Sequence, residues 1–344
     1  MLAFMPHRTL ILGLESSCDD TAAAVVLNGR HILSNIISSQ NDLHHRFGGI
    51  VPEIASRRHL EMINPVIDEA LAKGGVTFGE LEGIAVSHGP GLVGSLLVGV
   101  ATAKALSFAL DLPLIAVNHI EGHIYANFLT GAAIIFPILC LVVSGGHTSL
   151  IYMRDHGELS VIGRTRDDAA GEVFDKVARA LSLGFPGGPA IEKLAQCGDP
   201  SAFSFPRALM SEEGKLDFSF SGLKTAVLNF MRREKEKGSV KMEDLAAAFQ
   251  EAVVDVLVEK TTLALRQYPA RQLLLAGGVA ANSELRRRMR RRMVEEGVEF
   301  ISPPPQLCTD NGAMIGAAGY YALRRGRLAS PTLNAVSTLA LESV

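Results

Sequence analysis

The sequence predicts an α/β fold built from two similar lobes, and three observations support this prediction. The chain has 344 residues, enough for two domains of ordinary size, and 48% of them are apolar, which supplies two hydrophobic cores. Apolar strand patterns alternate with amphipathic helical patterns, as in sheets that helices cover on both faces. The same order of elements also occurs twice along the chain.

Each half opens with a hairpin pattern, in which two apolar strands flank a short polar turn. These hairpins occupy residues 9–27 and 137–153. Helical periodicity follows at residues 59–75 in the first half and 242–267 in the second. Mixed or parallel sheets are therefore expected in both lobes.

Both halves continue with a strand, a glycine turn and a helix, at residues 81–106 and 271–294. A further strand and helix close each half, at residues 113–129 and 299–323. Open sheets of this kind bind ligands beyond the carboxyl ends of their strands, so a cleft between the lobes is the expected site.

We expect an N-terminal lobe at 1–130, a C-terminal lobe at 131–330 and a tail at 331–344. Residues about 154–242 are extra in the second half and contain the punctuating sequence GFPGGP. They are interpreted as an inserted subdomain that contacts substrate, or alternatively as a surface excursion without a ligand.

Charge and cysteine usage exclude several classes of protein. The chain has 33 basic and 36 acidic residues, a net charge of −3, so a polyanion would need a local basic patch. The four cysteines form no C-x-x-C pair, which excludes a zinc ribbon and argues against a disulfide framework. No signal-peptide pattern is present, and proline and paired glycines interrupt the uncharged stretch 122–153. A cytoplasmic protein without a membrane segment is expected.

Two histidines predict a metal site. His119 and His123 are four residues apart where a helical pattern begins, so their imidazoles share one helix face. The matching junction of the second half carries Asp310, and facing lobes would bring it to the histidines across the cleft. Two His and one Asp leave positions open for water or substrate, as in a catalytic metal site. Asp310 as a simple helix cap is the alternative.

The histidine pair does not indicate a zinc peptidase. The H-E-x-x-H motif requires its glutamate directly after the first histidine, and Glu121 comes one position later. Glu121 is therefore expected to point away from the two imidazoles.

Three glycine turns raise the question of a phosphate site. Residues 89–94 match G-x-G-x-x-G, but no acidic residue ends the next strand, so tight packing is the preferred explanation. Residues 144–148 (SGGHT) could form a phosphate-binding nest or an ordinary β-turn. Residues 277–282 precede a helix, where Asn282 could bind an anion or simply cap the helix.

Two acidic residues flank the sequence GFPGGP on helical patterns. Asp175 and Glu192 could bind the hydroxyl groups of a nucleoside or remain solvated acids.

One dense cationic cluster could grip RNA phosphates, or could be a solvated helix face. It comprises Arg286, Arg287, Arg288, Arg290, Arg291 and Arg292. Lys215 and Lys224 are alternative phosphate contacts.

Six motifs in one order resemble the TsaD family of tRNA adenosine threonylcarbamoyltransferases, formerly described as O-sialoglycoprotein endopeptidases. The motifs are ESSCDDTAAAVV, NHIEGHIYA, LVVSGGHTSL, FDKVARALSLGFPGGP, LLLAGGVAAN and SPPPQLCTDNGAMIG. The resemblance implies the duplicated actin, hexokinase and Hsp70-like fold (ASKHA). It also implies transfer of a threonylcarbamoyl group from threonylcarbamoyl-AMP to the exocyclic amine of the adenosine 3′ of the anticodon, in tRNAs reading codons that begin with A.

The resemblance assigns site residues as well. His119, His123 and Asp310 match the family's metal ligands, for iron or zinc. The residues that match its substrate and nucleotide positions are Val142, Val143, Ser144, Gly145, Gly146, Asp175, Gly188, Glu192 and Asn282. His147, Asp19 and Asp20 also lie in its motifs, and Asp20 replaces the commoner glutamate.

The family implies partners: tRNA, threonylcarbamoyl-AMP, an inactive paralogous subunit like TsaB and a P-loop ATPase like TsaE. Two other classes remain open. An ATP-dependent small-molecule kinase of the same fold would not explain the histidine pair, because magnesium prefers oxygen ligands. A non-catalytic partner subunit would tolerate loss of all three metal ligands.

Overall fold

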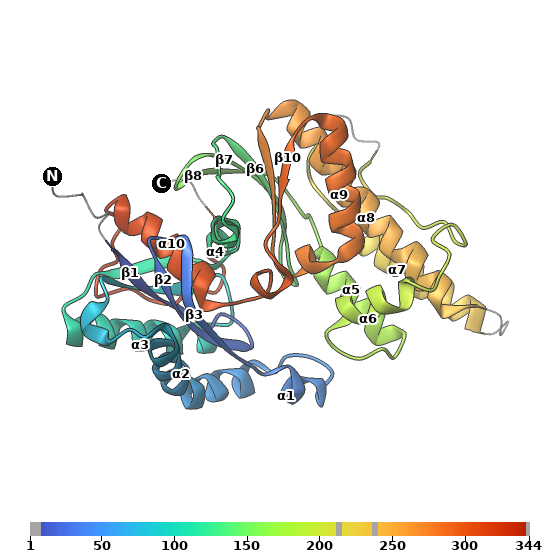
Figure 1. The fold of residues 1–344 in the computed structure, drawn as a ribbon. Coiled ribbons are helices and arrows are strands. Elements are labelled where there is room, and N and C mark those ends of the chain that lie inside the picture. The colour runs from blue at the N-terminus through green and yellow to red at the C-terminus, as the bar shows by residue number, and fades with distance from the viewer. Residues whose placement is uncertain (1–7, 211–214, 236–239, 342–344) are drawn as a thin grey trace. The chain divides into compact units, whose positions relative to one another are not determined.

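The structure, a computed structural model, describes residues 8–210, 215–235 and 240–341 (Figure 1). The chain divides into two compact units. The first contains the chain up to Asp42, together with Ile50–Ala133 and Thr309–Leu341. The second contains Leu43–Gly49 and Ile134–Cys308.

The first unit is built on a five-stranded sheet of order β3-β2-β1-β4-β5. Its strands are β1 (Leu10–Glu15), β2 (Asp20–Leu27), β3 (His31–Ser39), β4 (Gly83–Gly89) and β5 (Leu114–Asn118). The first three strands are antiparallel, and β1, β4 and β5 are parallel to one another. The sheet is mixed, as its hairpin and crossover patterns predict.

The second unit repeats this plan with the sheet order β10-β9-β6-β7-β8. Its strands are β6 (Ile138–Val143), β7 (Thr148–Asp155), β8 (Glu158–Arg164), β9 (Gln272–Ala276) and β10 (Glu299–Ile301). The antiparallel and parallel pairings match those of the first sheet strand for strand. The duplicated α/β fold is therefore confirmed.

Helices cover these sheets (Figure 1), and each unit has a large hydrophobic core of its own. The helices are α1 (Asn41–His45), α2 (Pro52–Gly74), α3 (Val93–Leu110), α4 (His119–Tyr125), α5 (Ala170–Ala180), α6 (Gly187–Ala195), α7 (Ser221–Lys235), α8 (Met242–Gln267), α9 (Ser283–Glu296) and α10 (Gly312–Arg324). Short 3-10 turns lie at Phe78–Glu80, Ala126–Thr130, Gly278–Ala281 and Pro305–Leu307.

Helix α10 packs on the first sheet, against β1, β2 and β4, although the chain reaches it from the second unit. Small residues allow this close approach. A Cβ at Gly13 would lie 2.2 Å from the carbonyl oxygen of Gly312, and one at Gly316 would lie 2.8 Å from Val26. The predicted boundary placed residues 309–330 in the second lobe, and the structure groups Thr309–Leu341 with the first unit.

The last part of the chain also belongs to the first unit. The amide of Val336 donates to the carbonyl of His88, and the Asn118 side chain donates to the carbonyl of Ala340. The predicted separate tail at 331–344 is thus, as far as Leu341, part of the first unit's structure.

Sequence patterns missed the third strand of each sheet. Strand β3 carries mostly polar and half-exposed residues, and β8 lies at a sheet edge, so neither shows strong apolar alternation. Because β8 is the counterpart of β3, the extra segment begins after Arg164 and not at residue 154. Its aromatic residues Phe205, Phe218 and Phe220 are buried in the second unit's core.

One described helix, α3, is long and apolar enough to cross a membrane, judged by length and composition alone. One side of α3 packs against β4, where Leu96, Val100 and Ala103 are buried. The uncharged stretch 122–153 is divided among α4, a 3-10 turn, β6 and β7.

Candidate metal centre and nucleotide loops

The histidine pair lies where β5 passes into α4. The Asn118 side chain accepts hydrogen bonds from the amides of Ile120 and Glu121, so the helix begins at His119. His119 and His123 therefore share one face one turn apart, as predicted, and both are buried. Their rings meet edge to face, with centroids 4.7 Å apart.

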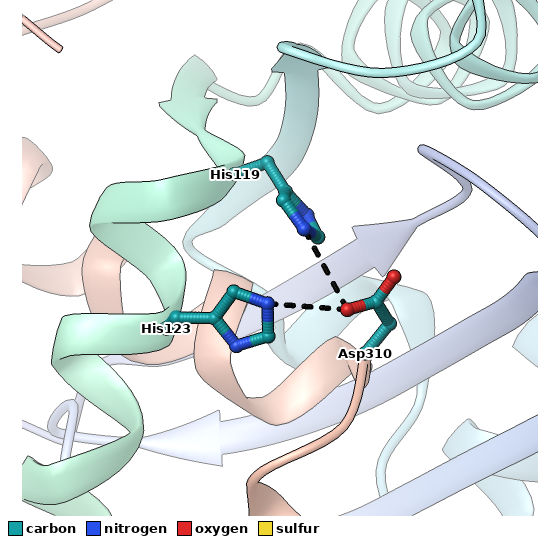
Figure 2. Close-up of side chains that lie close together, drawn as sticks. All are labelled: His119, His123 and Asp310. Atoms are coloured by element: carbon teal, nitrogen blue, oxygen red, sulfur yellow. Dashed lines mark ion pairs between the residues drawn. The ribbon is translucent and has the colours of Figure 1, made fainter. Parts of the chain in front are cut away.

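Asp310 approaches this pair from the segment that leads into α10. Its Oδ1 lies 3.2 Å from Nε2 of His123 and 3.6 Å from Nε2 of His119 (Figure 2). The N-cap of α10 is Asn311, whose side chain accepts from the amide of Met314, so helix capping does not explain Asp310. All three residues belong to the first unit, so the expectation that Asp310 comes from the second lobe is wrong.

The three side chains fit a divalent metal ion. Their potential ligand atoms all lie within 4.8 Å of one another. Ligands about 2.0–2.2 Å from a tetrahedral ion are about 3.4 Å apart, close to the separations from Asp310. Both ring nitrogens of His123 are buried without a hydrogen-bond partner among the described residues, and an ion would satisfy Nε2.

Glu15 orients His119, and sequence reasoning missed this role. Glu15 Oε2 lies 3.0 Å from Nδ1 of His119, and the hydroxyl of Ser17 lies 3.1 Å from the same nitrogen. A proton on Nδ1 shared with Glu15 leaves Nε2 to face Asp310. Burial disfavours the charged imidazole, but Glu15 and Asp310 overcome this effect and raise the pKa of His119 to about 9.

The β1–β2 turn adds two further groups near Asp310. Burial and the negative charge of Asp310 raise the pKa of Asp20 to about 7. Burial, with smaller contributions from Asp19 and Asp310, raises the pKa of the Cys18 thiol. In the sequence, the run of polar residues ESSCDD was the feature that could have indicated these titratable groups near Asp310.

Glu121 points away from the metal cluster, as its position on the helix predicts. Its Oε1 lies 3.7 Å from Nη1 of Arg327, in the segment after α10. Burial raises the pKa of Glu121, and Arg327 opposes this effect.

The glycines at 89–94 serve backbone packing. A Cβ at Gly89 would lie 2.1 Å from the carbonyl oxygen of Val336, and one at Gly91 would lie 2.5 Å from that of Ser17. These contacts account for the motif without a dinucleotide.

A second group of predicted residues surrounds the β6–β7 turn in the second unit. The amide of Ser144 donates to the carbonyl of His147, which closes the turn, and the amide of Gly171 donates to the carbonyl of Ser144. Val142 and Val143 are buried in β6, so they can offer only backbone groups to a ligand. A Cβ at Gly145 or Gly146 would meet no atom within 4 Å.

The other predicted nucleotide residues lie on neighbouring helices of the same unit. Asp175 accepts from the amide of Gly187 at the start of α6, and Glu192 accepts from the amide and hydroxyl of Ser283. Asn282 caps α9 by accepting from the amide of Leu285, and it donates to Gln250.

Two glycines in this region, Gly188 and Gly278, have open space where a Cβ would stand, like Gly145 and Gly146. Neither packing nor a left-handed backbone conformation requires glycine at these four positions. Close approach of a ligand to the backbone would explain them.

The arginine cluster on α9 is largely occupied within the protein. Arg288 pairs with Asp255 and Glu251, and Arg292 pairs with Glu259. Arg286 donates to backbone carbonyls, Arg287 pairs with Glu284, Arg291 lies 3.9 Å from Glu295, and Arg290 lies over the Phe300 ring. These contacts favour a structural role for most of the cluster.

The structure is that of a duplicated α/β protein with a His–His–Asp cluster that could hold a metal ion and with glycine-rich loops in its second unit. The sequence model of the family "TsaD: tRNA N6-adenosine threonylcarbamoyltransferase" matches residues 31–317. The chain therefore belongs to the TsaD family, and it is a transferase that modifies tRNA.

Curated relatives of the same name cover nearly the whole chain. The protein of Symbiobacterium thermophilum is 60% identical over 332 residues, which are 96% of this chain and 97% of that protein. The protein of Moorella thermoacetica is 55% identical over 342 residues, 99% of this chain and all of that protein.

Solved structures of low identity share the fold. Thermococcal HypF (T. kodakarensis) superposes with a TM-score of 0.63 at 16% identity, over 94% of this chain and 50% of that chain. The activator of 2-hydroxyisocaproyl-CoA dehydratase from Clostridium difficile, with bound ADPNP, superposes with a TM-score of 0.53 at 14% identity, over 93% of this chain and 97% of that chain.

Proposed function

We propose that the protein transfers the threonylcarbamoyl group of threonylcarbamoyl-AMP to the exocyclic amine of the adenosine 3′ of the anticodon, in tRNAs reading codons that begin with A. The observation that carries this proposal is the His119–His123–Asp310 cluster in a chain of the TsaD family. Two imidazoles and a carboxylate suit iron or zinc and leave positions open for substrate oxygens.

The adenylate is assigned to the loops of the second unit. The open backbone at Gly145, Gly146, Gly188 and Gly278 supports phosphate binding, since exposed amides stabilise anionic oxygens. Asp175 and Glu192 would accept hydrogen bonds from the ribose hydroxyls, and Asn282 would contact the nucleotide. His147 lies at the same turn and is proposed as a substrate contact.

The reaction requires attack of a neutral amine on the carbamoyl carbon and departure of AMP. A divalent ion supplies Lewis-acid polarisation of a substrate oxygen. The backbone amides of the glycine loops would stabilise the charge that develops on the leaving phosphate. Catalysis in this scheme depends on positioning and electrostatics, and no covalent enzyme intermediate is formed.

The decisive experiment is nucleoside analysis of tRNA incubated with the protein and threonylcarbamoyl-AMP. A TsaB-like subunit and a TsaE-like ATPase, the partners we propose, would be included, and chelator would be added in parallel. His119→Ala should lose bound metal and modification together, whereas His31→Ala, an exposed histidine of the same unit, should keep both. A metal-free His119 variant that modifies tRNA at the wild-type rate would refute the proposal.

The alternative function, phosphoryl transfer to a small molecule, predicts ADP formation from ATP without tRNA. The histidine ligands argue against it, because magnesium in kinase sites prefers oxygen. A cytoplasmic location is part of the proposal, since tRNA is the substrate.

A further inference from the structure

A cationic groove lies between two helices of the second unit. It has a volume of about 420 Å³ and is lined by Lys176, Arg179 and Ala180 of α5 and by Lys224, Leu228 and Arg232 of α7. The three α7 residues are spaced by four, so they share one helix face. Four cations thus converge on one recess of a protein whose net charge is −3.

Two partly exposed acids, Asp168 and Glu172, hold the lysines in place without neutralising the groove. Asp168 accepts from Lys176 and Lys224, and Glu172 also pairs with Lys176. Although desolvation opposes it, hydrogen bonds from Lys224, Ser221 and Lys176 lower the pKa of Asp168, which stays ionised at neutral pH. Two acids against four cations leave a net charge of about +2.

The two arginines carry this excess charge. Among the residues that the structure describes, no carboxylate pairs with Arg179 or Arg232, and both are exposed. Arg179 uses one donor, Nη2, on the carbonyl of Gly48 at 2.6 Å. A guanidinium has five donors, so most remain available for phosphate oxygens.

The hydrogen bond from Arg179 to Gly48 places the segment that carries Phe47, an exposed aromatic residue, next to the groove. Leu43–Gly49 clusters with the second unit, and Phe47 in this segment is 57% exposed. Arg46 next to it is exposed as well. Cations beside an exposed ring are the combination that binds single-stranded nucleic acid, through phosphates and base stacking.

We infer that the α5–α7 groove and Phe47 form the RNA-binding surface, with phosphates at Arg179 and Arg232 and an unstacked base on Phe47. This inference rests on the proposed function, because it takes the tRNA as the bound RNA. It does not require the α9 arginines, most of which are held by acidic side chains or backbone carbonyls. Helix α5 links the surface to the nucleotide loops, since Asp175 lies one turn before Arg179.

The test is binding of a transcript of a tRNA that reads a codon beginning with A, measured as a function of salt with the full-length protein. Arg179→Glu/Arg232→Glu should weaken binding about 10- to 100-fold and reduce the slope of log affinity against log salt by roughly two. Phe47→Ala should weaken binding several-fold with an unchanged slope, and Phe47→Tyr should restore it. Arg291→Glu on α9 is the matched control and should bind within about twofold of wild type.

Wild-type affinity and salt slope in the double variant, with an unchanged melting temperature, would overturn the inference. Intact RNA binding combined with loss of a protein partner in pull-down would overturn it too, and would assign the groove to that protein. RNA binding is measured without threonylcarbamoyl-AMP. Failure of the proposed transfer activity therefore remains distinguishable from failure of this inference.

Discussion

Glu15 Oε2 lies 3.0 Å from Nδ1 of His119, while the other ring nitrogen, Nε2, faces Asp310. Glu15 is fully buried at the end of β1, and His119 begins α4 after β5. One carboxylate thus contacts Nδ1 of the ring and another faces Nε2, the proposed metal ligand. Carboxylates commonly position metal-binding histidines in this way.

Glu15→Gln should weaken metal binding about 10- to 100-fold, because an amide donates less electron density to the imidazole and fixes its tautomer less strongly. Tightly buffered metal titration would measure the change. Glu82→Gln, a carboxylate outside the metal cluster, serves as control and should bind metal like the wild type. Equal affinities of the Glu15 variant and the wild type would show that the contact does not position His119.

Metal binding should release protons. The pKa of His119 is raised to about 9 against an ordinary value of 6.5, so its ring is protonated at pH 7 before an ion binds. Apparent affinity should therefore rise about tenfold per pH unit up to about pH 9, with about one proton released at pH 7. Calorimetry in buffers of different ionisation enthalpy measures this number; a value of zero contradicts the assignment.

The same shift sets the pH dependence of the metal-free protein. A raised pKa means that the folded state binds the proton more tightly than the unfolded state. This contribution to stability is complete below pH 6.5 and is lost as pH rises through about 9. Between pH 6.5 and pH 9, the melting temperature of the metal-free wild type should therefore fall by more than that of the metal-free His119→Gln variant. Equal falls in the two proteins would contradict the raised pKa.

Gly13→Ala should disrupt the packing of α10. The new methyl group would stand 2.2 Å from the carbonyl oxygen of Gly312 and 2.3 Å from the amide nitrogen of Gly316, both backbone atoms. We expect a loss of about 1–3 kcal/mol in unfolding free energy and weaker metal binding, since Asp310 directly precedes this helix. Gly222→Ala, where a Cβ meets no atom, should be neutral or slightly stabilising in the same denaturation assay.

Asp168→Asn should lower the melting temperature at pH 7, because the carboxylate ties α5 to α7 through Lys176 and Lys224. Its pKa is lowered in the folded protein, so its contribution is present above the ordinary value of 3.8 and disappears as pH falls below it. Melting curves of variant and wild type should converge in acid. A constant difference at all pH values would indicate a packing effect.

Much of the fold was predictable because the duplication repeats its patterns of strands, turns and helices. The His119–His123 pair followed from helical spacing alone, and its face was predicted correctly. The origin of Asp310 was not, because the symmetry of the two halves suggested that α10 would cover the second sheet. The signal lay in Gly312, Gly316 and Gly319, whose spacing permits close packing on β1, β2 and β4.

Glu15 illustrates a different limit of sequence reasoning. The sequence pattern indicates only that Glu15 is the polar end of an apolar strand. The pairing of β1 with β4, and of β4 with β5, is what brings Glu15 near His119. Long-range pairing of this kind leaves no local pattern.

The return of α10 to the first sheet has a consequence for biosynthesis. During translation, both histidines are synthesised before any strand of the second sheet, and Asp310 is synthesised only after the last strand of that sheet, β10. The nascent first unit lacks α10, the helix that packs on β1, β2 and β4, until all strands of the second sheet have been synthesised. A product that terminates before Asp310 therefore lacks one of the three candidate ligands and could not assemble the candidate metal centre.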